Sequence, residues 1–215
     1  MTGVQTCALP ISGSAIAKAA AINRITGTSN IVAEVGTTQV AGSAMSAAGT
    51  GSAGTITING TAIAITLSAS SDYATNRAAV VAAINLNAGA TGVTATDNLS
   101  TANGVTLKAA DGRNITVAFD GVNLSASNTG VGAAGTYAGT YTLRSLSQCS
   151  ITVSSNVGGT LANADLGLGT YSSNTAQFSS KARSGSTAAP VALTSGDLVI
   201  NGYNIGAAFT SDDTA

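Results

Sequence analysis

The chain has 215 residues, of which 8% are charged and 44% hydrophobic, and its formal net charge is −1. This balance excludes the clustered basic surface of a nucleic-acid-binding protein and the polybasic segments that attract anionic membranes. The longest apolar helix-like run, Ala78 to Ile84, is far shorter than the roughly 20 residues that span a bilayer.

Aromatic residues make up 4% of the chain and tryptophan is absent, so alanine and valine supply most of the apolar side chains. These side chains bury little area each, and the stability of a core scales with its buried apolar area. We therefore predict an α+β, mainly β fold, in which hairpins and short strands pack on one short amphipathic helix per unit. The abundance of glycine, serine and threonine is typical of an extracellular structural or adhesive protein.

The first eleven residues, Met1 to Ile11, differ from the rest of the chain. They hold one of the two cysteines, Cys7, and one of the two prolines. They lack the basic and apolar regions of a secretory signal. The segment is similar to translated sequencing-adapter read-through, so we interpret residues 1–12 as an artefact and exclude them from fold prediction.

The next elements are short. Residues 14–24 are rich in alanine and predict a helix, with Gly27 and Asn30 as stop signals. Residues 31–41 alternate between apolar and polar side chains and predict a pair of strands. Residues 42–53 are rich in glycine, serine and alanine and predict a loop.

Residues 54–67 carry the clearest local signal. Asn59-Gly60 lies between two alternating runs, which predicts a hairpin with a type I′ turn. A helix is predicted from Tyr73 to Leu86, with Asp72 among the residues that cap its start. Asn87 and Gly89 are expected to end this helix.

A β-rich region follows. The turn pair Asp111-Gly112 lies between two apolar runs, and we interpret it as a hairpin turn. Residues 154–190 are polar, with Tyr171 and Phe178 as expected anchors. The predicted strands of this region start near Val93 and cover Val105–Leu107, Ile115–Phe119, Tyr137–Leu143 and Ile151–Val153.

Ile-Asn pairs recur along the chain. Two end predicted helices and lie 62 positions apart (85 − 23), and two begin predicted hairpin turns and lie 142 positions apart (201 − 59). The pairs are Ile22-Asn23, Ile84-Asn85, Ile58-Asn59 before Gly60, and Ile200-Asn201 before Gly202. Internal repeats are typical of arrays. We therefore expect the back half of one unit at 13–48, a complete unit at 49–146, a polar β and loop region at 147–195, and the front half of a further unit at 196–215.

The Ile-Asn pairs resemble the flagellin hook IN motif of bacterial flagellins, which occurs in the variable, surface-exposed middle region of those proteins. Two further stretches, Ala109 to Asn114 and Tyr137 to Leu143, also resemble that region. The resemblance covers most of residues 14–215. It implies a secreted structural subunit of the flagellar filament, which serves motility and assembles with other flagellin subunits through helices at its two ends.

Those terminal helices are missing from this sequence, which has no long heptad pattern. The resemblance therefore implies a fragment, the outer domain that projects from a filament, and makes O-linked glycans on exposed serines and threonines plausible. The alternative is a repeat adhesin or a surface-layer or phage β domain, whose composition is the same.

Catalytic and metal sites find little support in the residue types. Histidine is absent, so neither a Ser-His-Asp nor a Cys-His arrangement can form, and zinc loses its commonest nitrogen ligand. Asp212-Asp213 is better explained as a helix cap than as a calcium loop. We predict no enzymatic activity, no cofactor and no metal.

The Ile-Asn asparagines are expected to be structural. Asn59 and Asn201 suit the positive φ of a tight turn, and Asn23 and Asn85 end helices, where asparagine tolerates the left-handed conformation. Cys149 is open to three interpretations: a reactive thiol, an intermolecular bridge, or a small apolar strand residue, the last being favoured.

Overall fold

The computed structural model describes residues 14–47, 51, 53–69, 71–147, 150–154, 171–173, 177–179 and 198–205. The predictions for Met1 to Ile11, Cys149 and Asp212-Asp213 concern residues outside these ranges. The fold is α+β and mainly β, as predicted. The chain divides into two compact units, which we name unit 1 (described residues of 14–36 and 138–205) and unit 2 (described residues of 37–137).

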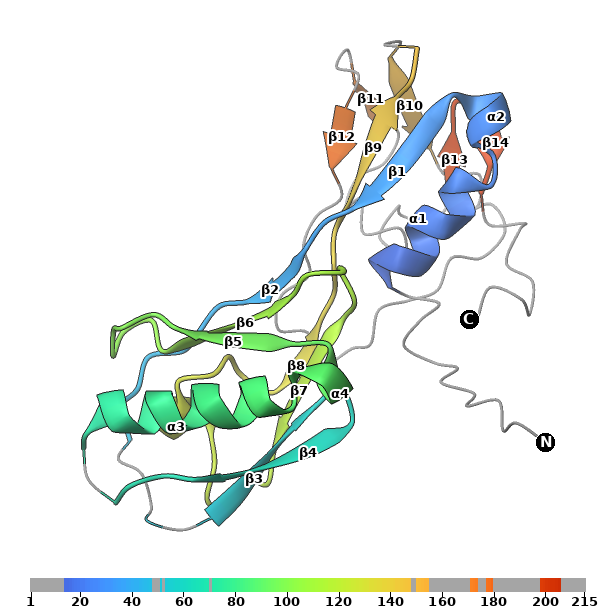
Figure 1. The fold of residues 1–215 in the computed structure, drawn as a ribbon. Coiled ribbons are helices and arrows are strands. Elements are labelled where there is room, and N and C mark those ends of the chain that lie inside the picture. Colours follow the sequence, from blue (N-terminus) through green and yellow to red (C-terminus); the bar gives the residue numbers. More distant parts are fainter. Residues whose placement is uncertain are drawn as a thin grey trace, which may run out of the picture. The chain divides into compact units, whose positions relative to one another are not determined.

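Unit 2 is built from a continuous stretch of chain (Figure 1). Its strands form two antiparallel sheets, in the orders β2-β6-β5 and β4-β3-β7-β8, and helix α3 packs against both β5 and β4. The elements are β2 Thr38–Val40, β3 Ala53–Ile58, β4 Thr61–Thr66, α3 Tyr73–Leu86, α4 Ala88–Thr91, β5 Thr94–Asp97, β6 Val105–Ala109, β7 Ile115–Phe119, α5 Ala126–Thr129 and β8 Gly135–Tyr137.

Unit 1 is built from two stretches that lie on either side of unit 2 in the sequence. Its strands also form two antiparallel sheets, in the orders β1-β9-β12 and β11-β10-β13-β14. The elements are α1 Ala15–Asn23, α2 Thr26–Ser29, β1 Ile31–Val35, β9 Tyr141–Ser145, β10 Ile151–Ser154, β11 Tyr171–Ser173, β12 Gln177–Ser179, β13 Val199–Ile200 and β14 Tyr203–Asn204.

The two units share one topology in cyclically permuted order. Read from α3, with β8 followed by β2, unit 2 runs α3-α4-β5-β6-β7-β8-β2-β3-β4. Unit 1 in chain order runs α1-α2-β1-β9-β10-β11-β12-β13-β14, and each strand has the partner that this correspondence requires. Unit 2 is therefore inserted between β1 and β9, at the place where its own β5 and β6 are joined by the loop 98–104.

Several elements form where short stretches of the sequence predicted them. Asn59 and Gly60 have φ of 49° and 81°, so the turn between β3 and β4 has the left-handed residues that a type I′ turn needs. Helix α3 has the predicted bounds, and Asp72 caps it by accepting a hydrogen bond from the Thr75 N–H at 3.1 Å. The second hairpin, β13 and β14, turns at Asn201, where φ is 49°.

Several strand pairings differ from those predicted. Strands β1 and β2 do not pair with each other, because β1 pairs with β9 and β2 pairs with β6. The predicted strand Tyr137–Leu143 is two strands, β8 and β9, in different units. Asp111-Gly112 is a turn but not a hairpin turn, because β6 and β7 belong to different sheets.

The unit boundaries also differ from those expected. The complete unit spans 37–137, since β2 completes one of its sheets, whereas β9 pairs with β1 and belongs to unit 1. The described strands of 147–195 and the hairpin of 196–215 join the helix and strand of 13–48. The expected back half and front half therefore combine into one unit.

Of the residues expected to end helices, Asn30 and Asn87 do so, whereas Gly27 and Gly89 do not. Gly27 and Gly89 lie inside the short helices α2 and α4. The left-handed residues that end these helices are Asn30, with φ of 55°, and Gly92, with φ of 70°. Both units therefore continue for one more turn before their next strand begins.

Candidate functional site

The isoleucines of the four Ile-Asn pairs are core residues. Ile58 and Ile84 are fully buried in the core of unit 2, and Ile22 and Ile200 are fully buried in the core of unit 1. Each therefore anchors its neighbouring asparagine at the boundary between an apolar core and the surface.

The helix asparagines bind the free edge of a strand. The Asn85 Oδ1 accepts a hydrogen bond from the Ala95 N–H at 2.7 Å, and its Nδ2 donates to the Ala95 carbonyl at 3.0 Å. Asn23 makes the same two bonds to Ala33, with the same lengths. Because β5 and β1 are edge strands, these side chains satisfy backbone groups that would otherwise be open to another strand.

This role corrects the expectation for Asn23 and Asn85. Asn85 lies inside α3 and Asn23 is the last residue of α1, and neither is among the described residues with positive φ. Their amide groups, rather than left-handed backbone conformations, account for asparagine at these positions.

The turn asparagines connect each hairpin to two other elements. The Asn59 Oδ1 accepts a hydrogen bond from the Thr116 N–H at 2.8 Å, and its Nδ2 donates to the Thr91 carbonyl at 2.9 Å. In unit 1, Asn201 accepts from the Thr152 N–H at 2.9 Å and donates to the Ser29 carbonyl at 3.5 Å. Each turn is thereby fixed to a neighbouring strand and to the end of a short helix, α4 or α2.

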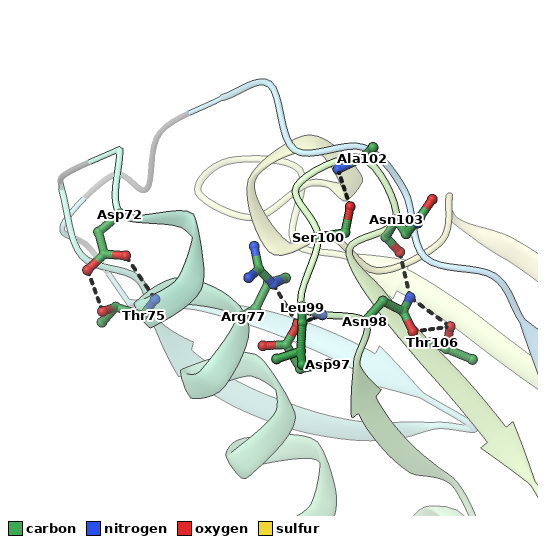
Figure 2. A network of polar contacts seen from close by, with 10 residues as sticks. All are labelled: Asp72, Thr75, Arg77, Asp97, Asn98, Leu99, Ser100, Ala102, Asn103 and Thr106. Atoms are coloured by element: carbon green, nitrogen blue, oxygen red, sulfur yellow. Dashed lines mark hydrogen bonds and ion pairs between the residues drawn. The ribbon is translucent and has the colours of Figure 1, made fainter.

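Polar contacts near the start of α3 include an ion pair that the sequence did not indicate (Figure 2). The Arg77 Nε lies 2.6 Å from the Asp97 Oδ1, and the two side chains are 6% and 21% exposed. The same carboxylate oxygen accepts a hydrogen bond from the Leu99 N–H at 2.8 Å. This ion pair therefore joins α3 to the end of β5, where the loop 98–104 begins, and its residues, 20 positions apart, give no local sequence signal.

Further hydrogen bonds from Asn98 hold the loop 98–104. The Asn98 Nδ2 donates to the Asn103 carbonyl at 2.7 Å and to the Thr106 Oγ1 at 2.9 Å. Leu99 is 85% exposed and has a φ of 54°, which is unfavourable for a bulky side chain. The network fixes the shape of the loop and leaves the Leu99 side chain in solvent.

A second polar cluster closes the loop after β7. The Asp120 carboxylate accepts hydrogen bonds from the backbone N–H groups of Thr55, Leu124, Val122 and Asn123 at 2.8 to 3.1 Å. These bonds, that from Leu124 foremost, lower the pKa of Asp120 from its ordinary 3.8 to about 2. The carboxylate is thus a structural anion whose acceptor positions are taken by the backbone.

Beside this loop lies an open hollow of about 470 Å³, lined by residues that include Phe119, Leu124 and Asn128. None of its lining side chains is titratable, so it offers apolar surface and amide or hydroxyl groups but no acid or base.

In the loop Asp111 to Asn114, the two charged side chains form an ion pair with each other. The Arg113 Nη2 lies 2.7 Å from the Asp111 Oδ2, and the hydrogen bond from this guanidinium lowers the pKa of the Asp111 carboxyl. An acid already paired in this way is a poor cation ligand. Within the described part of the chain, no group of three or more His, Cys, Asp or Glu gathers to hold a metal, and no helix is long and apolar enough to cross a membrane.

Neither the protein-family models nor the curated proteins gave a match to this chain.

Proposed function

We propose that this chain is the surface-exposed outer region of a bacterial flagellin, and thus a secreted structural component of the flagellar filament. The proposal combines the resemblance of the Ile-Asn pairs with what their side chains do. All four asparagines stabilise an element boundary, and the same set of bonds is present in both units. The repeated feature is a set of contacts that hold elements of the fold together, which favours a structural role.

The observation that carries the proposal is the cyclic permutation. Unit 2 is inserted into one strand connection of unit 1. Among the described residues, the elements of unit 1 begin with α1 and end with β14, at the place where unit 2 runs continuously from β4 into α3. A unit whose chain enters and leaves at one place in the topology is suited to insertion between two halves of another protein. A flagellin outer domain is carried in this way between two terminal helical regions.

In this role the chain would form exposed surface of the filament. Other flagellin subunits would assemble through helices outside this sequence, and O-linked glycans would attach to exposed serines and threonines. The near-neutral surface would set the solubility and antigenicity of the filament.

Long sequencing reads through the genomic locus test this proposal. Segments with sustained heptads on both sides, and other coding sequence in place of Met1 to Ile11, would support it. Further β repeats or a surface anchor would refute it in favour of an adhesin. Antibodies raised against the purified chain should label filaments along their whole length, and preincubation with the chain should abolish the labelling.

A further inference from the structure

The core of unit 1 is shared between two segments that meet only after a long excursion of the chain. Residues 14–36 contribute Ile22 and Ile31, among others, and residues 138–205 contribute Leu143 and Ile200, among others. All of these side chains are fully buried. The core of unit 1 is therefore complete only when both segments are present.

Besides the shared core, backbone and side-chain hydrogen bonds and the Glu34–Arg144 ion pair join the segments. Strands β1 and β9 pair in register from Ile31↔Ser145 to Val35↔Tyr141. The Gly36 N–H donates to the Thr140 carbonyl at 2.8 Å. The Asn201 side chain donates to the Ser29 carbonyl. All of them could form equally well between residues 14–36 of one chain and residues 138–205 of another.

We propose that, in a fraction of the molecules, unit 1 is completed by a second copy of this chain. Residues 14–36 of that copy take the place of the same segment in the first copy. The exchanged and closed forms share every contact within unit 1, so their balance is set by mass action rather than by new contacts. Exchange becomes substantial when the local concentration of chains approaches the effective concentration at which unit 2 holds residues 14–36 beside residues 138–205 of the same chain. The proposal does not depend on the flagellar assignment.

Unit 2 supplies an internal control. Its equivalent strands β5 and β6 are joined directly by the loop 98–104, so they pair within one chain. Glu34↔Thr142 in unit 1 corresponds to Thr96↔Thr106 in unit 2 (34 + 62 = 96). The Asn23 side chain bonds to the N–H and carbonyl of Ala33, so these backbone groups point away from β9. The next residue, Glu34, therefore forms a hydrogen-bonded pair with Thr142 of β9. Such pairs have Cα atoms about 5.5 Å apart, within the range of a disulfide.

The experiment uses the full chain with Cys7→Ser and Cys149→Ser, which removes its own cysteines. Glu34→Cys with Thr142→Cys is the test variant, and Thr96→Cys with Thr106→Cys is the control. Both are refolded over a hundredfold range of concentration, oxidised, and separated by denaturing electrophoresis without reductant.

We expect the test variant to give covalent dimers whose ratio to monomer rises about tenfold or more across this range, as mass action requires. The control should remain monomeric. Equal dimer fractions in the two variants, or test-variant disulfides confined to single chains, would overturn the proposal. If the thiols fail to oxidise, light scattering decides with the unsubstituted chain refolded at the same concentrations, and a monomer throughout overturns the proposal equally.

Discussion

Replacing Asn85 with alanine tests whether the Ile-Asn asparagines stabilise the units. The change removes both bonds to Ala95, at 2.7 and 3.0 Å, and leaves the N–H and carbonyl of a residue that is 6% exposed without those partners. A typical hydrogen bond contributes about 1 kcal/mol net, so Asn85→Ala should lower the free energy of unfolding of unit 2 by about 2 kcal/mol. The matched control is Leu86→Ala, because this neighbour in α3 is 87% exposed; its effect should stay within about 0.5 kcal/mol.

Amide hydrogen exchange gives the most specific measurement, because the chain has two units and a single melting curve would mix them. A loss of about 2 kcal/mol corresponds to roughly 30-fold faster exchange through unfolding of the unit. The Val105 amide, which donates to the Gly130 carbonyl at 2.8 Å and keeps that acceptor, should show this acceleration in Asn85→Ala, whereas the Asn201 amide, which donates to the Thr152 carbonyl at 2.9 Å, should show it in Asn23→Ala. If Asn85→Ala exchanges no faster at Val105 than Leu86→Ala does, the asparagine bonds do not stabilise the unit and the reasoning fails.

Three further changes test other parts of unit 2. The pKa of Asp120 is lowered to about 2 from 3.8, so its charge stabilises the folded chain above about pH 4, and that contribution is lost as the pH falls through about 2; an acid titration followed by circular dichroism should show a smaller loss over this window in Asp120→Asn. Gly92→Ala should destabilise by about 1 to 2 kcal/mol, because φ is +70° and a Cβ would meet the Arg113 guanidinium, whereas Gly89→Ala, with open space around it, should be neutral or stabilising by up to about 1 kcal/mol; equal denaturation midpoints would contradict this. Leu99→Gly should stabilise by about 1 kcal/mol in urea denaturation, since φ is 54° and the side chain is 85% exposed, and a destabilised variant would show that Leu99 makes a contact that stabilises the loop.

Elements whose signals lie within a few residues were predictable. The turn at Asn59-Gly60 follows from the positive φ that those residue types tolerate, and the start of α3 follows from the capping oxygen of Asp72. In both cases the residues that determine the structure are neighbours in the sequence, so no tertiary information is needed.

Strand partners were not predictable in the same way. Strand β1 lies next to β2 in the sequence, yet it pairs with β9, and the ion pair between Glu34 and Arg144 spans 110 positions. Alternation shows which face of a strand is buried but not which strand lies beside it. For this reason the separate half units were expected where the structure has one unit.

The repeated Ile-Asn pairs identified the candidate residues, but the role expected for the two helix asparagines was wrong. An asparagine near a helix end is usually explained by its tolerance of a left-handed backbone conformation. Asn23 and Asn85 instead use their side-chain amides to form hydrogen bonds with a residue 10 positions ahead. The equal offsets to Ala33 and Ala95 were visible in the repeat, but their meaning depends on which strand is an edge. The Arg77–Asp97 pair had no repeat to reveal it.

The nesting of unit 2 within unit 1 has a kinetic consequence. The bond from the Gly36 N–H to the Thr140 carbonyl closes a loop of 104 residues (140 − 36), for which loop-closure entropy grows to about 4 kcal/mol plus a constant. Folding of the contiguous unit 2 removes most of that cost in advance, so unit 2 should fold first and unit 1 second. During synthesis, residues 14–36 are made before their partners and keep Ile22 and Ile31 exposed until more than a hundred further residues have followed. The high contact order of unit 1 thus leaves its first segment open to aggregation while the rest of the chain is made.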